Sequence, residues 1–175
     1  PLGLSVFKTK QGYNSPNSQK FHLLGDPTLR LNVPQYFGSI DSINGQLLNV
    51  DIQIKALSDT KIAGTILKPD GTKWNEYNGE GLLTVFDSER TKLLEEISRN
   101  YPFTMIIPGG VIFRGRVSAI NGEFEAEFVV PKDISYENKN GKIIFYFFDL
   151  STDGLAFTNK IIVGGTDTTA FNDGD

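Results

Sequence analysis

The fold is decided by residues 111–130, whose sequence is VIFRGRVSAINGEFEAEFVV. Two runs that alternate between apolar and polar residues are separated only by Asn121-Gly122. This dipeptide is the strongest short-range signal for a β-hairpin, because both residues tolerate the positive φ angles of a tight turn. We therefore predict a hairpin with one face in a core and one charged face in solvent. The predicted inward side chains are Val111, Phe113, Val117, Ala119, Phe124, Ala126 and Phe128, and the outward ones are Arg114, Arg116, Glu123, Glu125 and Glu127.

Other segments also have the pattern of short strands. Residues 51–56 alternate with period two, and residues 61–67 and 81–86 resemble them, with a turn at Pro69-Asp70-Gly71. Residues 143–148 are apolar at every position, which predicts a central strand covered on both faces and hence two sheets. The last strand is expected over residues 156–163, ending at Gly164-Gly165. Together these segments predict an all-β, immunoglobulin-like β-sandwich of about 7–8 strands.

Composition agrees with a β fold, since the chain contains 13 Phe, 6 Tyr, 18 Gly and 8 Pro. Two regions are less regular. Residues 4–11 are a short mixed stretch, and the simplest interpretation of residues 21–33 is a strand over residues 21–24, a turn at Gly25-Asp26-Pro27 and a strand over residues 28–33. Residues 88–101 fit either a helix, with Leu93, Leu94 and Ile97 on one face, or a long surface loop.

Charge and cysteine content exclude several functions. The net charge of −4 and the scattered basic residues argue against a nucleic-acid partner. The chain has no cysteine, so it contains no disulfide, thiolate metal site or cysteine nucleophile. Since no apolar run is long enough to span a bilayer, we do not expect a membrane-spanning protein. The start at Pro1-Leu2-Gly3-Leu4, without a signal sequence, leads us to expect a piece of a longer precursor.

Few residues are candidates for chemistry, and no cofactor is expected. His22 is the only histidine, and its apolar neighbours favour a packed or edge residue over a catalytic base. The three glutamates of the hairpin are interpreted as a solvated face beside Arg114 and Arg116, not as a glycosidase pair or a cation site. Asp149, Ser151 and Asp153 imitate the start of a calcium loop, but Lys160 stands at its twelfth position, so an ordinary turn is favoured.

The segment around Gly25-Asp26-Pro27 carries a resemblance to a known family. Residues 17–34, NSQKFHLLGDPTLRLNVP, resemble the segment that closes the caspase-like α/β peptidase domain of gingipain-family cysteine peptidases. Residues 114–117 (RGRV), 121–124 (NGEF), 128–136 (FVVPKDISY) and 163–165 (VGG) resemble the module after the peptidase domain in the type IX secretion sortases of Bacteroidetes.

The resemblance implies three parts: residues 1–34 as the end of a peptidase domain, residues 36–165 as an immunoglobulin-like β-sandwich, and residues 166–175 as a linker to a following domain. It also implies a parent cysteine endopeptidase, extracellular or associated with the outer membrane, that removes C-terminal secretion signals from cargo. The catalytic Cys and His of that family lie upstream of the Gly-Asp-Pro segment, and His22 falls on a variable position of the motif.

The sequence and the resemblance support two hypotheses of function. In the first, the chain is a non-catalytic accessory module whose partners are its own upstream peptidase domain and secreted cargo or type IX secretion components. In the second, it is a carbohydrate-binding or adhesive module of a bacterial surface protein. The second requires Trp74, Tyr77 and Tyr101 to be exposed on loops as a binding platform, whereas packing of these rings over the ends of the sandwich is favoured.

Overall fold

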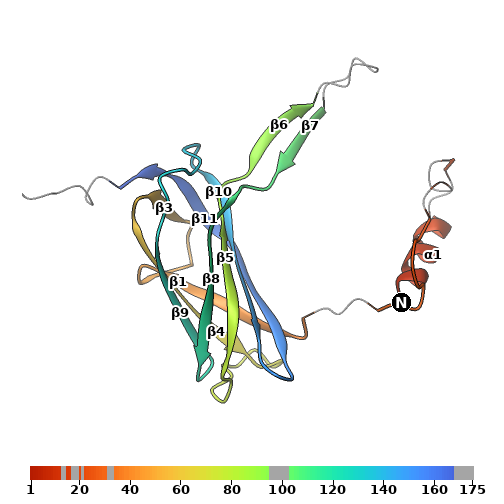
Figure 1. The fold of residues 1–175 in the computed structure, drawn as a ribbon, viewed down its shortest axis with the longest axis horizontal. Coiled ribbons are helices and arrows are strands. Elements are labelled where there is room, and N and C mark those ends of the chain that lie inside the picture. The colour runs from red at the N-terminus through yellow and green to blue at the C-terminus, as the bar shows by residue number, and fades with distance from the viewer. Residues whose placement is uncertain (13–14, 17–19, 21, 31–33, 95–102, 168–175) are drawn as a thin grey trace, which may run out of the picture. The chain divides into compact units, whose positions relative to one another are not determined.

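The structure is a computed structural model that describes residues 1–12, 15–16, 20, 22–30, 34–94 and 103–167. It contains two compact units, Pro1–Val33 and Pro34–Asp175 (Figure 1). Within the described part of the chain, no helix has the length and apolar character that a membrane span needs.

The first unit contains one helix, α1 (Leu2–Gly12), where only a short mixed stretch was expected. The turn at Gly25-Asp26-Pro27 explains how the helix begins. Asp26 Oδ1 accepts a hydrogen bond from the backbone N–H of Thr28 at 2.8 Å, and the turn presents carbonyl groups to the start of α1. The N–H groups of Leu2 and Gly3 donate to the carbonyls of Leu29 and Pro27, each at 2.9 Å, which satisfies two donors of the first helical turn.

The two strands predicted around this turn are wrong for the described residues. Residues 22–30 form bends and turns without a strand, while Phe21 and residues 31–33 lie outside the described residues. The physical reason is that the backbone groups of the turn bond to the helix and to the Asp26 side chain instead of to a second strand.

The second unit is built from strands. Their bounds are β1 (Tyr36–Ile43), β2 (Gln46–Leu47), β3 (Ile52–Ala56), β4 (Asp59–Leu67), β5 (Gly79–Phe86), β6 (Arg90–Leu94), β7 (Phe103–Ile107), β8 (Val111–Ile120), β9 (Glu123–Val129), β10 (Lys139–Phe148) and β11 (Asp153–Thr166). The larger sheet has the order β2-β1-β4-β9-β8-β5-β10-β11-β3, with an additional pairing of β1 with β11.

That additional pairing closes the sheet, so the predicted sandwich is wrong and the fold is a 7-strand mixed β-barrel. Tyr36, Phe37 and Gly38 of β1 pair in parallel with Gly154, Leu155 and Ala156 of β11. In a sandwich the two sheets would keep separate edges. Here β1 also pairs with β4, so every barrel strand has a neighbour on both sides (Figure 1). The prediction of a mostly β chain is confirmed.

The hairpin at Asn121-Gly122 is confirmed. Both residues have positive φ angles, 53° and 73°, and the turn brings Ala119 opposite Phe124 and Ile120 opposite Glu123. Phe124, Ala126 and Phe128 are buried, and the intervening glutamates are exposed. In β8, Val117 and Ala119 are buried as predicted, Phe113 is half-buried, and Val111 is exposed at the end of the strand. The hairpin therefore supplies one side of the barrel wall.

Phenylalanine rings fill much of the barrel interior. Phe145 is fully buried and stacks on Phe124 with the ring centroids 3.9 Å apart. A Cβ added to Gly81 would lie 2.4 Å from the Phe145 ring, so glycine at this position leaves the room that the ring occupies. Strand β10 alternates, with Ile143, Phe145 and Phe147 facing inward. The prediction that residues 143–148 are covered on both faces is therefore wrong, because a single closed sheet covers only the inner one.

Strands β6 and β7 form a separate two-stranded sheet that extends from the barrel as an arm (Figure 1). Neither the helix nor the loop proposed for residues 88–101 describes it, because Arg90–Leu94 is a strand, while residues 95–102 lie outside the described residues. Leu93 pairs with Thr104 and Leu94 with Phe103, so pairing with a distant segment decided the local structure.

At the carboxyl end, β11 does not stop at Gly164-Gly165 but continues to Thr166. The pairing of β11 with β3 shifts between Val163 and Thr166, and Gly165 has a φ of 78°. The two glycines therefore form a bulge within the strand instead of ending it. Of the predicted linker, Thr166 belongs to β11, and residues 168–175 lie outside the described residues.

Candidate functional site

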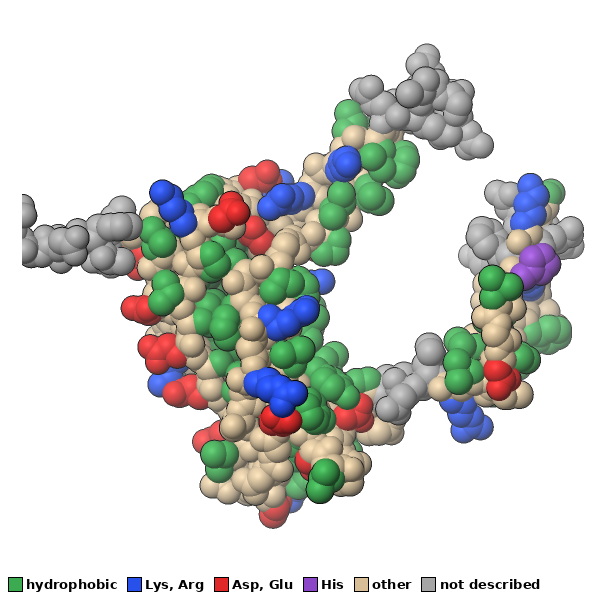
Figure 2. Space-filling view, viewed as in Figure 1, with side chains coloured by type: hydrophobic (Ala, Val, Ile, Leu, Met, Phe, Trp, Pro, Cys, Tyr) green, Lys and Arg blue, Asp and Glu red, His purple; other side chains and the backbone are tan. Residues whose placement is uncertain are grey.

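One side of the barrel exterior is charged. Lys61 on β4 forms an ion pair with Glu125 on β9 at 2.8 Å, and Lys73 binds Glu123. The hydrogen bond from Lys61 to Glu125 and the charge of that carboxylate raise the pKa of Lys61. Both ion pairs are exposed, so each contributes little to stability. This side has the character of an ordinary solvated surface, and Figure 2 shows charged side chains along the edge of the barrel where β9 lies.

The partners of these glutamates differ from the prediction. Arg114 and Arg116 were expected beside them, but Arg116 binds Glu80 on β5 at 3.2 Å and Arg114 Nε donates to Thr84 Oγ1 at 3.4 Å. The reason lies in strand order. Strand β9 pairs with β4 along the whole segment from Asp59 to Thr65, whereas β8 pairs with it only next to the turn.

The opposite part of the exterior carries a cluster of apolar side chains over four adjacent strands, β1, β11, β10 and β5, together with the charged residues Glu80, Lys142 and Asp153. Phe37 on β1 pairs with Leu155, which pairs with Tyr146, which in turn pairs with Leu82. Paired residues of neighbouring strands point to the same side of a sheet, so these side chains form one surface. We call this surface the outer apolar face, and it consists of Phe37, Leu82, Ile144, Tyr146, Phe148, Leu155 and Phe157.

The outer apolar face is exposed to solvent. Phe37 is 66% exposed and Phe157 is 54% exposed, and Tyr146 and Leu82 are also exposed. Hydrophobic side chains gather over β5 and β10 in Figure 2. Large contiguous apolar patches on a protein surface usually mark sites of interaction. The clustering of these apolar side chains makes the surface over β1, β11, β10 and β5 the part of the barrel best suited to contact another protein or domain.

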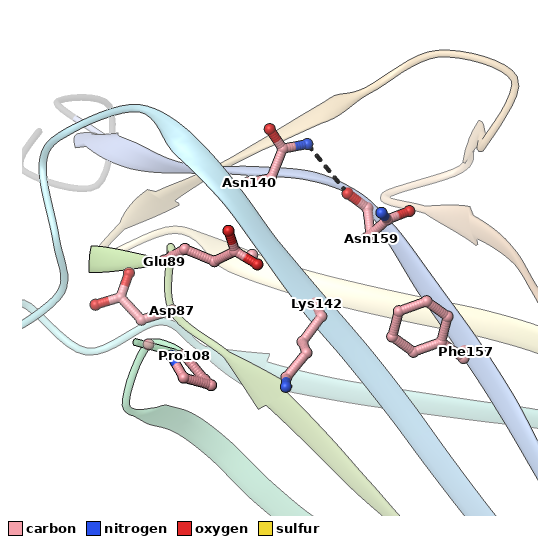
Figure 3. A pocket seen from close by; sticks show the side chains of 9 residues that line it. Asp87, Glu89, Pro108, Asn140, Lys142, Phe157 and Asn159 are labelled. Carbon is pink, nitrogen blue, oxygen red and sulfur yellow. Dashed lines mark hydrogen bonds between the residues drawn. The ribbon is translucent and has the colours of Figure 1, made fainter. Parts of the chain in front are cut away.

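A hollow of about 410 Å³ lies beside this face, at the root of the arm (Figure 3). Its lining residues are Asp87, Glu89, Pro108, Gly109, Asn140, Gly141, Lys142, Phe157 and Asn159. Asp87 is buried, and its two carboxylate oxygens accept hydrogen bonds from the backbone N–H groups of Ser88 and Ser135, both at 2.7 Å. Lys142 Nζ lies 4.6 Å from the centroid of the Phe86 ring.

The chemistry of the hollow is structural. Asp87 is used to hold two backbone segments, and Asn140 donates to the carbonyl of Asn159 at 3.2 Å, as Figure 3 shows. Among the residues that the structure describes, no three His, Cys, Asp or Glu side chains are grouped as a metal site would require. The hydrogen bonds of Asp87 and Asn140 in the lining of the hollow therefore hold the root of the arm. Phe157, which also lines the hollow, belongs to the outer apolar face.

Of the calcium candidates, Asp149 and Ser151 lie in the connection between β10 and β11, and Asp153 is the first residue of β11. Asp149 Oδ1 accepts hydrogen bonds from the backbone N–H groups of Ser151 and Thr152, both at 2.7 Å, and these bonds lower the pKa of Asp149. Asp153 Oδ2 instead accepts a hydrogen bond from the Tyr146 hydroxyl at 3.1 Å. A turn held by Asp149 accounts for the spacing of these residues without a cation, and calcium binding stays a prediction.

The remaining sequence candidates are His22 and the aromatic residues Trp74, Tyr77 and Tyr101. His22 is exposed and belongs to the first unit. Trp74 and Tyr77 pack together with ring centroids 5.4 Å apart, and Tyr77 also contacts Phe147. Tyr77 is only 2% exposed, and burial raises its pKa to about 12. Tyr77 is therefore packed, as the favoured interpretation expected, and it is not part of the exposed platform that the second hypothesis requires. Tyr101 lies outside the described residues.

Comparisons with known proteins show a likeness at the level of structure. No protein family profile matches the chain, and no curated protein sequence matches it. The chain matches part of the crystal structure of dimeric latent PorU from Porphyromonas gingivalis, with a TM-score of 0.67 and 26% sequence identity. The match covers 95% of this chain and 16% of the PorU chain, so the chain spans about one sixth of that protein. The chain is therefore similar to one module of PorU.

Proposed function

We propose that this chain is a non-catalytic accessory module of a larger secreted cysteine endopeptidase of the gingipain family that resembles PorU. The observation that carries this proposal is the outer apolar face of the closed barrel. In PorU the similar module is 16% of a long chain, which supports a place among other domains of one protein. In this proposal the barrel docks on another domain of its own protein through Phe37, Leu155, Phe157 and their neighbours.

The size of the apolar face supports docking on energetic grounds. Burial of one exposed phenylalanine side chain contributes about 1.5–3 kcal/mol. Phe37 and Phe157 are more than half exposed, so covering them together with Leu82 and Tyr146 contributes several kcal/mol. A domain in the same polypeptide is present at an effective concentration in the millimolar range, so a contact of this size is sufficient to hold it.

The first unit supports the assignment of residues 1–34 to the end of a peptidase domain. Helix α1 has no buried residue, and Leu4, Phe7 and Leu29 are each more than half exposed. Apolar side chains of a short helix normally pack into a core. We propose that these side chains belong to the core of a larger domain, and that the catalytic Cys and His of the protein lie in that domain.

The remaining elements of the proposal come from the resemblance to type IX secretion sortases. The protein would act at the cell surface, associated with the outer membrane, and would remove C-terminal signals from secreted cargo. Because PorU in the matched structure is a dimer, self-association of this protein is included in the proposal.

The non-catalytic assignment predicts that the isolated chain does not cleave proteins. Purified residues 1–175 are incubated with an unfolded protein substrate and with peptides from the C-terminal signals of secreted proteins, and cleavage is followed by mass spectrometry. We expect no cleavage, since the chain contains no cysteine and its only histidine, His22, is exposed in the first unit. Reproducible cleavage that disappears in His22→Ala, and persists in the matched variant Lys20→Ala, would contradict the assignment.

A further inference from the structure

The arm formed by β6 and β7 is firmly attached at its root. The backbone N–H of Asp87 donates to the carbonyl of Gly110 at 2.8 Å, and that of Glu89 donates to the carbonyl of Asn140 at 3.1 Å. The Asp87 side chain binds Ser135 on a third segment. The arm therefore starts from a fixed base on the barrel, and its own two strands pair with each other.

The arm itself exposes an unusual number of apolar side chains. Leu93 is 57% exposed, Phe103 54%, Met105 42% and Ile106 64%. An isolated two-stranded ribbon is marginally stable in water, and three or more strands are normally needed for independent stability. Pairing with a further strand would therefore stabilise the arm.

Among the described residues, β6 and β7 pair only with each other, and their outer edges differ in charge. Strand β6 carries Arg90 and Lys92, and charged side chains on an edge strand oppose the addition of another strand. Strand β7 consists of Phe103, Thr104, Met105, Ile106 and Ile107 and carries no charge. It has the composition of a segment that readily pairs with a further strand. The open edge of β7 is therefore the edge suited to pairing.

We infer that β7 pairs in antiparallel fashion with β7 of a second copy of the chain, with Met105 at the centre, to form a four-stranded sheet. This inference rests on the proposed self-association and names its surface. A two-fold axis through Met105 places Phe103 opposite Ile107 of the second copy and Thr104 opposite Ile106. Aromatic residues paired with β-branched residues are favourable cross-strand neighbours, and no charge faces a like charge across the new pairing.

A second copy fits this edge because an antiparallel copy repeats the same uncharged pattern and places no charge opposite a like charge. The contact involves only five residues from each strand, so it is smaller than a standard protein interface. We therefore expect a dissociation constant on the order of 10–100 µM for the chain alone.

The test is analytical ultracentrifugation of residues 1–175 over a concentration range that brackets this constant. The wild-type chain is expected to shift from monomer to dimer as concentration rises. Met105→Lys and Met105→Glu each place two like charges opposite each other across the two-fold axis, and each is expected to raise the dissociation constant about tenfold or more. Met105 also pairs with Lys92 inside the arm, so the lysine variant adds repulsion within the arm whereas the glutamate variant does not, and Met105→Glu is the decisive variant. Thr91→Lys, on the exposed strand β6 of the same arm, is the matched control and is expected to leave the dimer intact.

A charge-reversal pair makes the test specific for the register. Met105→Lys mixed with Met105→Glu is expected to restore dimers of mixed composition, because opposite charges then face each other. A wild-type chain that stays monomeric at every concentration would refute self-association. A dimer that survives Met105→Glu, or that Thr91→Lys disrupts equally, would refute the β7 surface while self-association itself stands. Thermal melts of each variant confirm that the barrel is folded.

Discussion

Phe145→Ala is expected to lower the free energy of unfolding by about 3–5 kcal/mol. Phe145 is fully buried inside the barrel, where it stacks on Phe124 and lies across Gly81. Removing the ring leaves a cavity that the closed wall cannot fill, because the neighbouring strands are hydrogen-bonded on both sides. Urea denaturation measures the effect as a lower midpoint with an unchanged m-value.

Phe157→Ala is the matched control, because it removes the same atoms from the outer side of the barrel. Phe157 is 54% exposed, so the expected loss is less than about 1 kcal/mol. Its position opposite Ile144 on β10 makes the comparison local. Equal losses for the two variants would mean that both faces of this sheet are covered within the chain, as in a sandwich, and would contradict the barrel.

Cysteines placed at Phe37 and Leu155 are expected to form a cross-link that stabilises the chain by about 2–4 kcal/mol. These residues are paired in the parallel contact of β1 with β11 that closes the barrel. Disulfides form between residues whose Cα atoms lie within about 4.4–6.8 Å, a separation that neighbouring strands provide. The chain has no native cysteine, so the two introduced thiols have no competitor. Mass spectrometry and urea denaturation under oxidising and reducing conditions measure the two effects.

The variant with cysteines at Phe37 and Leu82 is the control for this experiment. Leu82 lies on β5, which is separated from β1 by β11 and β10, so no intramolecular cross-link is expected. Failure of the Phe37 and Leu155 cysteines to cross-link in the folded chain would show that β1 and β11 are not neighbours. Cross-linking of both pairs with equal yield would show that the reaction reports flexibility instead of strand pairing.

Local patterns in the sequence predicted every strand of the barrel wall except β1, since no strand was predicted over Tyr36–Ile43. The Asn121-Gly122 turn and the alternation after it specify which side chains face the core, and the structure confirms them. Closure into a barrel could not be predicted in the same way. It depends on the parallel pairing of β1 with β11, residues far apart in sequence, and alternation along each strand is identical in a sandwich and in a barrel.

Two of the errors of element type, at α1 and at residues 90–94, have a common physical cause. Helix α1 is stabilised at its start by carbonyl groups of Pro27 and Leu29, which a local pattern does not reveal. Residues 90–94 form a strand because they pair with residues 103–107. In both cases contacts with another segment outweigh local propensity.

The outer apolar face was partly foreseeable. Residues 143–148 are apolar at every position, which led to the expectation of cover on both faces. Inside this chain only the inner face is covered, so the apolar side chains of Ile144, Tyr146 and Phe148 stay partly exposed to solvent. Phe37 and Phe157 could not be added from sequence, because only the strand register places them beside these residues.

The central claim, that the outer apolar face docks on another domain of the same protein, is tested most directly by thiol labelling. Phe157→Cys is compared with Glu125→Cys, whose native side chain is 58% exposed on the charged side of the barrel. Each variant is labelled with a maleimide in residues 1–175 and in the full product of the gene, and peptide mass spectrometry measures the rate at each site. We predict that position 157 is labelled rapidly in residues 1–175 and about tenfold or more slowly in the full protein, with position 125 unchanged. Equal rates at position 157 in both proteins would contradict the claim.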